Sequence, residues 1–256
     1  MFVRPHTLSI ITTHQCTAAC DHCCFNCTPK VTTAIPVERI HGLIDEAREI
    51  TSIRVVVFTG GECFLLGDEL FALIAHVKAN GLIARCVTNG YWATEKNVRS
   101  IVSSLVSAGL DEINFSTGEE HGTYVPEDRV RRGAIACHEA GIKTLVNIEL
   151  FNGTNFDAVE FLESPGFKPH VESKSIKIQR NVWIEGDGQR KLEHRDAHSR
   201  FNPDRIGGCH TALNVIAITP NQMAVACCGL HLERIPELHI GSIASASLKS
   251  VLDGAQ

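Results

Sequence analysis

Cys16-Thr17-Ala18-Ala19-Cys20-Asp21-His22-Cys23-Cys24-Phe25-Asn26-Cys27 holds five of the eleven cysteines of the chain within twelve residues. Packing alone does not demand such a density of thiols. Thiolates this close repel one another unless a soft metal or an iron–sulfur cluster takes up their charge. Within the stretch, Cys16, Cys20 and Cys23 form the pattern Cys-x-x-x-Cys-x-x-Cys. Three cysteine ligands leave one iron of a [4Fe–4S] cluster open to bind another molecule.

This spacing resembles the cluster-binding signature of the radical S-adenosylmethionine (SAM) superfamily. The resemblance implies that Cys16, Cys20 and Cys23 hold a [4Fe–4S] cluster whose open iron chelates the amino and carboxylate groups of SAM. It also implies that His22, which occupies the aromatic position of the family before the last cysteine, stacks on a nucleobase. The alternative is zinc, held by the overlapping pairs Cys20-x-x-Cys23 and Cys24-x-x-Cys27.

Outward from the cysteines, strand and helix patterns alternate along the chain. Strand patterns cover residues 8–12, 54–59, 83–88, 112–117, 143–151 and 175–184. Helical patterns cover residues 37–50, 68–80, 94–108, 126–140 and 156–162. Six successive βα units predict an α/β fold, a partial (β/α)6 TIM-like barrel with its active site at the carboxyl ends of the strands. The cysteine stretch follows the first strand and is therefore expected at that mouth.

Gly60, Gly61 and Glu62 follow the second strand. Two glycines let the backbone approach a ligand closely, and the Glu62 carboxylate can accept a hydrogen bond from an ammonium group. A plain strand-to-helix turn is the alternative. The position matches the radical SAM motif that contacts the methionine amino group, so the resemblance covers about residues 8–184. The family often has proline next, whereas this chain has Cys63, a candidate catalytic thiol that donates a hydrogen atom in epimerase-like chemistry, a metal ligand, or a small packing residue.

The next strands carry polar side chains in pairs. Asn114 and Ser116 share one face of the fourth strand, and Asn147 and Glu149 share one face of the fifth, because side chains alternate along a strand. By the resemblance, Ser116 and Asn147 are candidates for the SAM ribose and the methionine carboxylate. His121 lies in the loop after the fourth strand, either near the mouth or on the surface.

A β-hairpin is predicted at residues 214–226, with its turn at 219–222. Cys209 precedes it, and Cys227 and Cys228 follow it. The arrangement resembles the twitch or SPASM extension of radical SAM enzymes, which holds an auxiliary iron–sulfur cluster.

The resemblance implies three regions and an auxiliary ligand set. The regions are a radical SAM barrel at residues 1–184, a linker at 185–204 and an extension of a β-hairpin plus helix at 205–256. The ligand candidates are Cys209, Cys227 and Cys228, although adjacent residues on an extended strand point to opposite faces. A fourth ligand is open among Cys24, Cys27, Cys63, His210 and His231. Structural zinc or free thiols are the alternatives to the auxiliary cluster.

Composition narrows the class of protein. The chain has 256 residues, a net charge of -5 and 44% hydrophobic residues, which fits a globular protein and gives no reason to expect a nucleic-acid partner. No apolar run approaches the length of a membrane span, and the first residues lack the apolar core of a signal peptide. Clustered cysteines then fit the reducing cytoplasm, where they bind metal.

The resemblance implies an enzyme that reductively cleaves SAM to a 5′-deoxyadenosyl radical, which abstracts a hydrogen atom from the substrate. Branches with such an extension mostly modify peptides, so the expected function is an oxidoreductase-type maturation of a ribosomal peptide by thioether or C–C crosslinking or epimerisation. The expected partners are a flavodoxin- or ferredoxin-type electron donor and, since the first strand begins by Leu8, a separate leader-peptide-binding protein. The alternatives are a radical SAM oxidase or mutase of a small metabolite, and a non-catalytic iron–sulfur electron carrier or sensor.

Overall fold

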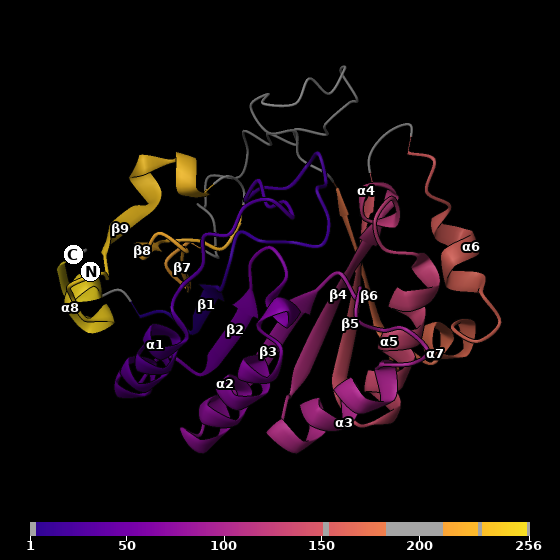
Figure 1. The fold of residues 1–256 in the computed structure, drawn as a ribbon, viewed down its shortest axis with the longest axis horizontal. Helices are drawn as coiled ribbons and strands as arrows, with labels where there is room; N and C mark the ends of the chain where they lie inside the picture. Colours follow the sequence, from indigo (N-terminus) through magenta and orange to yellow (C-terminus); the bar gives the residue numbers. More distant parts are fainter. Residues whose placement is uncertain (1–3, 151–153, 183–211, 230–231, 255–256) are drawn as a thin grey trace, which may run out of the picture.

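One curved β-sheet organises the protein. The structure, a computed structural model, describes residues 4–150, 154–182, 212–229 and 232–254. Within these ranges nine strands form a single sheet in the order β6-β5-β4-β3-β2-β1-β7-β8-β9 (Figure 1). The strands are β1 (Thr7–Ile11), β2 (Val55–Thr59), β3 (Ile83–Thr88), β4 (Glu112–Gly118), β5 (Lys143–Leu150), β6 (Lys177–Val182), β7 (Val215–Ile218), β8 (Met223–Val225) and β9 (His239–Ser242). All pairings from β6 to β7 are parallel, and the last two are antiparallel.

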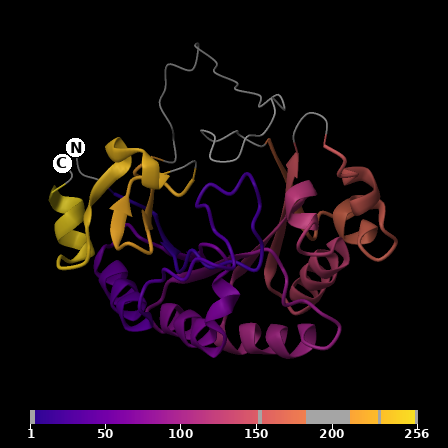
Figure 2. The same ribbon diagram turned by 45° about the horizontal axis from the view of Figure 1, so that its top comes forward.

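Helices cover the convex side of this sheet (Figure 2). The helices are α1 (Val37–Glu49), α2 (Asp68–Ala79), α3 (Val98–Ala108), α4 (Glu119–Gly122), α5 (Glu127–Glu139), α6 (Ala158–Glu163), α7 (Lys168–Glu172) and α8 (Leu248–Gly254). Three short 3-10 helices are η1 (Cys63–Leu66), η2 (Leu232–Arg234) and η3 (Pro236–Leu238). Apolar residues at helical spacing make the buried stripe of each long helix, as Ile40, Leu43, Ile44 and Ala47 do in α1.

The two faces of the sheet differ in polarity because side chains alternate along each strand. In β4, Ile113 and Phe115 are fully buried in the core beneath the helices, whereas Asn114 and Ser116 alternate with them and are half-buried. The loop between β1 and α1, which carries the clustered cysteines, lies on the concave side (Figure 2). The concave side therefore presents polar groups and thiols to one space.

The observed architecture confirms the predicted α/β fold with a parallel, partial TIM-like barrel. The sheet is not closed, because β6 and β9 are its edges. Two details differ from the sequence prediction. The third helix begins at Val98, after a turn in which Thr94 Oγ1 accepts a hydrogen bond from Asn97 N. The helix α7 was not expected, since its five residues are too short to give a periodic pattern.

The predicted hairpin is present as β7 and β8, and it extends the barrel sheet. β7 pairs in parallel with β1, Leu8 opposite Ile216, and all of Leu8, Ile10, Ile216 and Ile218 are fully buried. Sequence periodicity does not reveal this pairing, since the two strands are about two hundred residues apart. The division into a barrel, a linker and an extension stays a prediction, and residues 185–204 lie outside the described residues.

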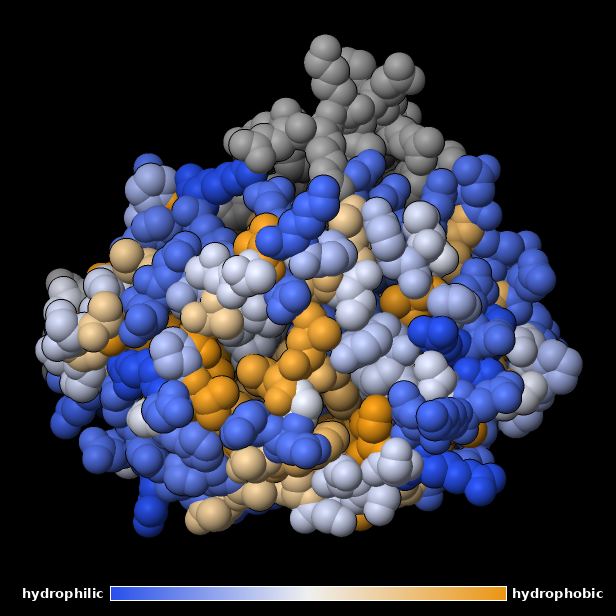
Figure 3. Space-filling view, viewed as in Figure 1, coloured by the Kyte–Doolittle hydropathy of each residue, from blue (hydrophilic) through white to orange (hydrophobic). Residues whose placement is uncertain are grey.

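The surface carries both hydrophilic and apolar side chains. On the face shown in Figure 3, hydrophilic side chains surround a band of apolar residues near the centre. Within the described ranges, no helix has the length and apolar character that crossing a bilayer requires.

Candidate active site

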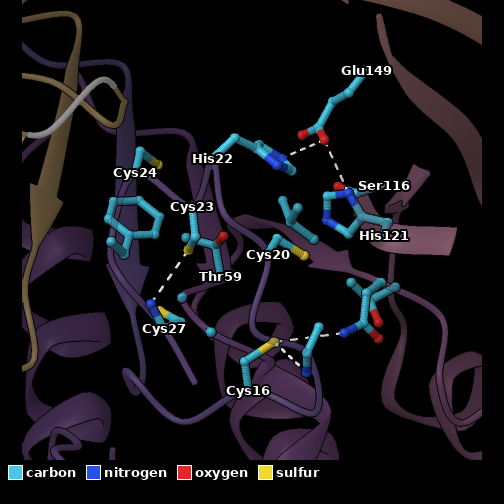
Figure 4. Close-up of a pocket in the computed structure, with 17 residues that line it drawn as sticks. Cys16, Cys20, His22, Cys23, Cys24, Cys27, Thr59, Ser116, His121 and Glu149 are labelled. Atoms are coloured by element: carbon cyan, nitrogen blue, oxygen red, sulfur yellow. Dashed lines mark hydrogen bonds and ion pairs between the residues drawn. The ribbon is translucent and has the colours of Figure 1, made fainter. Parts of the chain in front are cut away.

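A pocket opens at the carboxyl ends of β1 to β5, on the concave side of the sheet (Figure 4). All five thiols of the cysteine stretch line it. Further side chains around it come from the ends of successive strands: Thr59 from β2, Val87 and Thr88 from β3, Ser116 from β4 and Glu149 from β5. Parallel strands thus bring together residues that are far apart in the sequence.

The three thiols of the Cys-x-x-x-Cys-x-x-Cys pattern are shielded from water but not equivalent. Burial raises the pKa of Cys16 to about 11 and also raises the pKa of Cys20, because a thiolate is poorly solvated there. The Cys27 side chain, helped by backbone N–H groups, lowers the pKa of Cys23 to about 6. Bound iron would stabilise these thiolates in place of the water that burial excludes, because a metal deprotonates the thiols that coordinate it.

Gly60 and Gly61 allow the cysteine loop to pack closely against the end of β2. Gly61 N donates to Thr13 O at 2.7 Å, and Glu62 N donates to Gln15 O at 2.9 Å. A Cβ at Gly61 would lie 2.0 Å from Gln15 O, and one at Gly60 would lie 2.6 Å from Thr13 O. The contact therefore requires both glycines, and it places their backbone in the pocket wall.

Glu62 lies behind this wall and faces away from the pocket. Its carboxylate is fully buried and accepts hydrogen bonds from Thr88 Oγ1 at 2.9 Å, Asn89 N at 2.9 Å and Phe64 N at 3.1 Å. Asn89 in turn donates through Nδ2 to Cys16 Sγ at 3.6 Å. A contact between the Glu62 carboxylate and a ligand ammonium group stays a prediction; in this structure protein groups donate to the carboxylate. The carboxylate joins β2 and β3 beneath the cysteine loop.

Burial of the Glu62 carboxyl raises its pKa to about 7, although three hydrogen bonds favour the ionised form. A raised pKa means that the unfolded chain releases this proton first, so this group stabilises the fold less as pH rises from about 4.5 to about 7. We expect Glu62→Gln to destabilise the metal-free protein at pH 5 by about 2 kcal/mol. The difference should shrink towards pH 8 and disappear there, because the wild type loses up to ~3 kcal/mol of stability as Glu62 titrates and the variant lacks this group.

Urea unfolding at both pH values measures this difference. Glu69→Gln, an exposed carboxyl at the start of α2, is the matched control and should show no such pH dependence. A constant difference between wild type and Glu62→Gln across this range would show that burial does not raise the pKa of Glu62.

Cys63 does not lie at the position that the sequence predicts. Its side chain is fully buried in η1, and Sγ donates to Val87 O at 3.3 Å. It does not line the pocket. The predicted role of Cys63 as a catalytic thiol at the mouth is wrong for this geometry, because the turn into η1 directs the side chain into the core. Packing, the alternative drawn from the sequence, fits.

The remaining cofactor candidates divide into two groups. His22 and Ser116 line the pocket. Asn147 lies opposite Ser116 in the sheet but is not in the pocket wall, and Asn181 Nδ2 donates to its Oδ1 at 3.5 Å. A role for Asn147 toward the methionine carboxylate stays a prediction.

The sequence left His121 open between the mouth and the surface and gave Glu149 no role in the site. The structure places both in the pocket wall, with Glu149 between His22 and His121 (Figure 4). Because side chains alternate along β5, Glu149 lies on the same face as Asn147. This shared face is the signal in the sequence that could have identified Glu149 as a site residue. The contact of Glu149 with the cysteine loop depends on tertiary structure.

The cysteines of the extension approach the same loop. Cys228 Sγ lies 3.0 Å from Ser9 Oγ on β1. Burial raises the pKa of Cys24, and Cys228 is close enough to Cys24 to raise it further. β8 ends at Val225, so Cys227 and Cys228 follow the strand, and the objection that adjacent cysteines point to opposite faces does not apply. Cys209, His210 and His231 lie outside the described residues.

An open parallel barrel with clustered thiols at the carboxyl ends of its strands defines a class of protein that binds a metal cluster beside a second ligand. The model of the Radical SAM superfamily matches residues 10–164, more than half of the chain. The chain belongs to the radical SAM superfamily. Membership implies a [4Fe–4S] cluster and SAM.

Individual relatives agree with this assignment. The chain is 32% identical over 126 residues to the putative peptide biosynthesis protein YydG of Bacillus subtilis (strain 168), a match over 49% of this chain and 40% of that protein. The chain thus matches less than half the length of this relative. Structural similarity is found to SuiB of Streptococcus suis bound to the precursor peptide SuiA, with a TM-score of 0.65, 14% identity and coverage of 97% of this chain and 64% of that chain. It is also found to anSMEcpe with bound AdoMet, with a TM-score of 0.63, 13% identity and coverage of 97% and 80%. At these identities the two structures support the fold alone.

The pocket fits the implied groups on its own chemistry. Soft thiol donors converge at one end, and cysteine thiolates are the usual ligands of iron–sulfur clusters. Beside them, the Gly60-Gly61 backbone, a hydroxyl at Ser116 and the imidazole of His22 form a mixed polar and aromatic wall. Such a wall suits a nucleoside attached to an amino acid.

Proposed function

We propose that this protein is a radical SAM enzyme that modifies a peptide. The observation that carries the proposal is the convergence of Cys16, Cys20 and Cys23 with the Gly60-Gly61 wall in one pocket. The similarity to YydG, which is described as a putative peptide biosynthesis protein, and to SuiB, solved with its precursor peptide, supports a peptide as substrate. Maturation of a ribosomal peptide by crosslinking or epimerisation is the reaction class we propose.

Different residues of the pocket would bind the cluster and the separate parts of SAM. Cys16, Cys20 and Cys23 would hold the cluster, and the iron without a cysteine ligand would be free to bind SAM. The backbone at Gly60 and Gly61 would bind the methionine ammonium, and the Ser116 hydroxyl would bind the ribose. When bound, the cluster and SAM supply reductive cleavage of SAM and hydrogen-atom abstraction from the substrate. The protein orients the target C–H bond and keeps water away from the radical.

We further propose an auxiliary iron–sulfur cluster at the extension. Cys227 and Cys228 follow β8, and Cys24 approaches Cys228 from the cysteine loop. Burial raises the pKa of Cys228, so a metal ion would offset the cost of its ionisation there. The cluster would accept the electron released when the substrate radical is oxidised to product, or it would bind the substrate. A flavodoxin- or ferredoxin-type protein is the proposed electron donor, and a leader-peptide-binding protein is a proposed partner.

Anaerobic reconstitution tests the proposal. We expect the iron-loaded protein to release 5′-deoxyadenosine from SAM when dithionite is added. Intact clusters without 5′-deoxyadenosine would instead favour an electron carrier or sensor. Short precursor peptides encoded beside the gene are the substrates to try. Mass spectrometry would show the loss of a pair of hydrogen atoms on crosslinking, or deuterium from D2O at one Cα on epimerisation.

A further inference from the structure

The Glu149 side chain is held between two imidazoles at the pocket wall. Its Oε2 lies 2.5 Å from His22 Nε2 and 3.0 Å from His121 Nδ1 (Figure 4). The rings of the two histidines meet edge to face, with centroids 5.4 Å apart. An ionised carboxylate only accepts hydrogen bonds, so the facing nitrogen of each imidazole carries the proton. The positive charge of His121 overcomes the effect of burial and holds the pKa of Glu149 at about 2, which keeps this acceptor ionised.

Three segments of the chain meet at this carboxylate. Glu149 lies near the carboxyl end of β5, His121 belongs to α4, and His22 belongs to the cysteine loop. Gly118 makes the approach possible, because a Cβ there would lie 2.7 Å from Glu149 O and 3.1 Å from Glu149 Cβ. The position of Glu149 is therefore built into the pairing of β4 with β5.

The segment containing α4 contacts the cysteine loop at two further points. Glu120 Oε2 accepts a hydrogen bond from Asp21 N at 3.2 Å, and Tyr124 OH donates to Ala19 O at 3.0 Å. The backbone on the amino side of His22 is thus held by polar contacts. Cys23, the proposed iron ligand, follows His22 directly. With its backbone held on both sides, the remaining freedom of His22 is the rotation of its side chain, which the Glu149 carboxylate restrains.

We propose that Glu149 is a positioning residue that fixes the ring of His22 for contact with the nucleobase of SAM, and that His121 holds Glu149 in place. The inference rests on the proposed function, because it assigns a task within the SAM pocket. A ring that is already fixed loses little conformational freedom when the ligand binds. The residue that sets the ring plane lies on β5, far in sequence from the Cys-x-x-x-Cys-x-x-Cys pattern.

The affinity of the reconstituted protein for SAM, measured by equilibrium dialysis with the cluster oxidised, tests this role. We expect Glu149→Ala to raise the Kd about threefold to tenfold, the range that corresponds to one side chain immobilised in the complex. Glu149→Gln should recover part of the loss, since its amide oxygen still accepts from the imidazoles. Glu139→Ala, an exposed carboxyl on α5, is the matched control.

A double-mutant cycle separates positioning from a direct contact with SAM. His22→Phe keeps a flat ring that does not depend on a hydrogen bond to the carboxylate. Adding Glu149→Ala to His22→Phe should therefore change the Kd little. Iron content should match wild type in all these variants, and the change in the EPR signal of the reduced cluster on adding SAM should be altered in Glu149→Ala and partly restored in Glu149→Gln.

Three results would overturn the inference. One is an unchanged Kd in Glu149→Ala, and another is an equal loss from Glu149→Ala with and without His22→Phe. The third is stoichiometric Zn²⁺ or Mn²⁺ binding that Glu149→Gln abolishes, because two imidazoles and a carboxylate within 4.8 Å of one another are also a possible set of metal ligands. Iron-loaded wild type that binds no SAM would overturn the proposed function itself. The inference alone fails if wild type binds SAM and the Glu149 variants bind it equally well.

Discussion

Gly61→Ala is expected to lower the free energy of unfolding by more than about 3 kcal/mol and to prevent stable loading of the cluster. The new Cβ would lie 2.0 Å from Gln15 O and 2.5 Å from Gln15 C, so the backbone of the cysteine loop would have to move. That movement breaks the hydrogen bonds from Gly61 N to Thr13 O and from Glu62 N to Gln15 O. Both bonds set the position of Cys16, the first proposed ligand.

Urea unfolding of the metal-free protein and iron analysis after anaerobic reconstitution measure the two effects. Gly166→Ala is the matched control, because a Cβ at Gly166 has open space and its backbone conformation is ordinary. Wild-type stability and iron content in Gly61→Ala would show that the loop does not need the close contact at the end of β2.

The second large effect is expected from the cysteines, which should fall into two sets. Replacing Cys16, Cys20 and Cys23 together by alanine should remove about four iron atoms per chain and reduce 5′-deoxyadenosine to the level of a protein-free control. Replacing Cys227 and Cys228 by alanine should also remove about four iron atoms but leave some cleavage of SAM. The first set is proposed to hold the iron that binds SAM, whereas the second is proposed to hold the auxiliary cluster.

Cys137→Ala is the control for the loss of a buried thiol, since Cys137 is fully buried in α5 and does not line the pocket. It should keep the iron content of wild type. Equal iron in wild type and in the variant lacking Cys227 and Cys228 would remove the auxiliary cluster from the proposal. Zinc in place of iron at Cys16, Cys20 and Cys23 would remove the radical chemistry.

Local patterns in the sequence were sufficient to predict the strands and helices of the barrel. β2 is buried along its whole length, so its continuous apolar run identified it as a central parallel strand. Apolar residues at helical spacing identified α1, and Pro36 marked its start. The cysteine spacing identified the family because ligands of one cluster lie within a single loop and are therefore local in sequence.

Contacts between residues far apart in the sequence decided which groups Glu62 and Glu149 bind and where Cys63 lies. The partners of Glu62 and Glu149 lie on other strands and loops, and no period of 2 or 3.6 residues encodes them. The sequence therefore placed Glu62 in its motif but did not show that Thr88 and Asn89 donate to its carboxylate. It also placed Cys63 at the mouth. That placement failed because the direction of a side chain after a strand depends on the turn that follows.

By itself, the sequence determined the alternation of strands and helices, the thiols that can hold a cluster and the superfamily. Tertiary structure alone decided that β7 continues the sheet beside β1, that Cys63 belongs to the core, and that Glu149 meets His22 and His121 in the pocket. The reason is physical. Periodicity and motif spacing report on neighbours along the chain, whereas a pocket at the ends of parallel strands is assembled from residues that only the folded chain brings together.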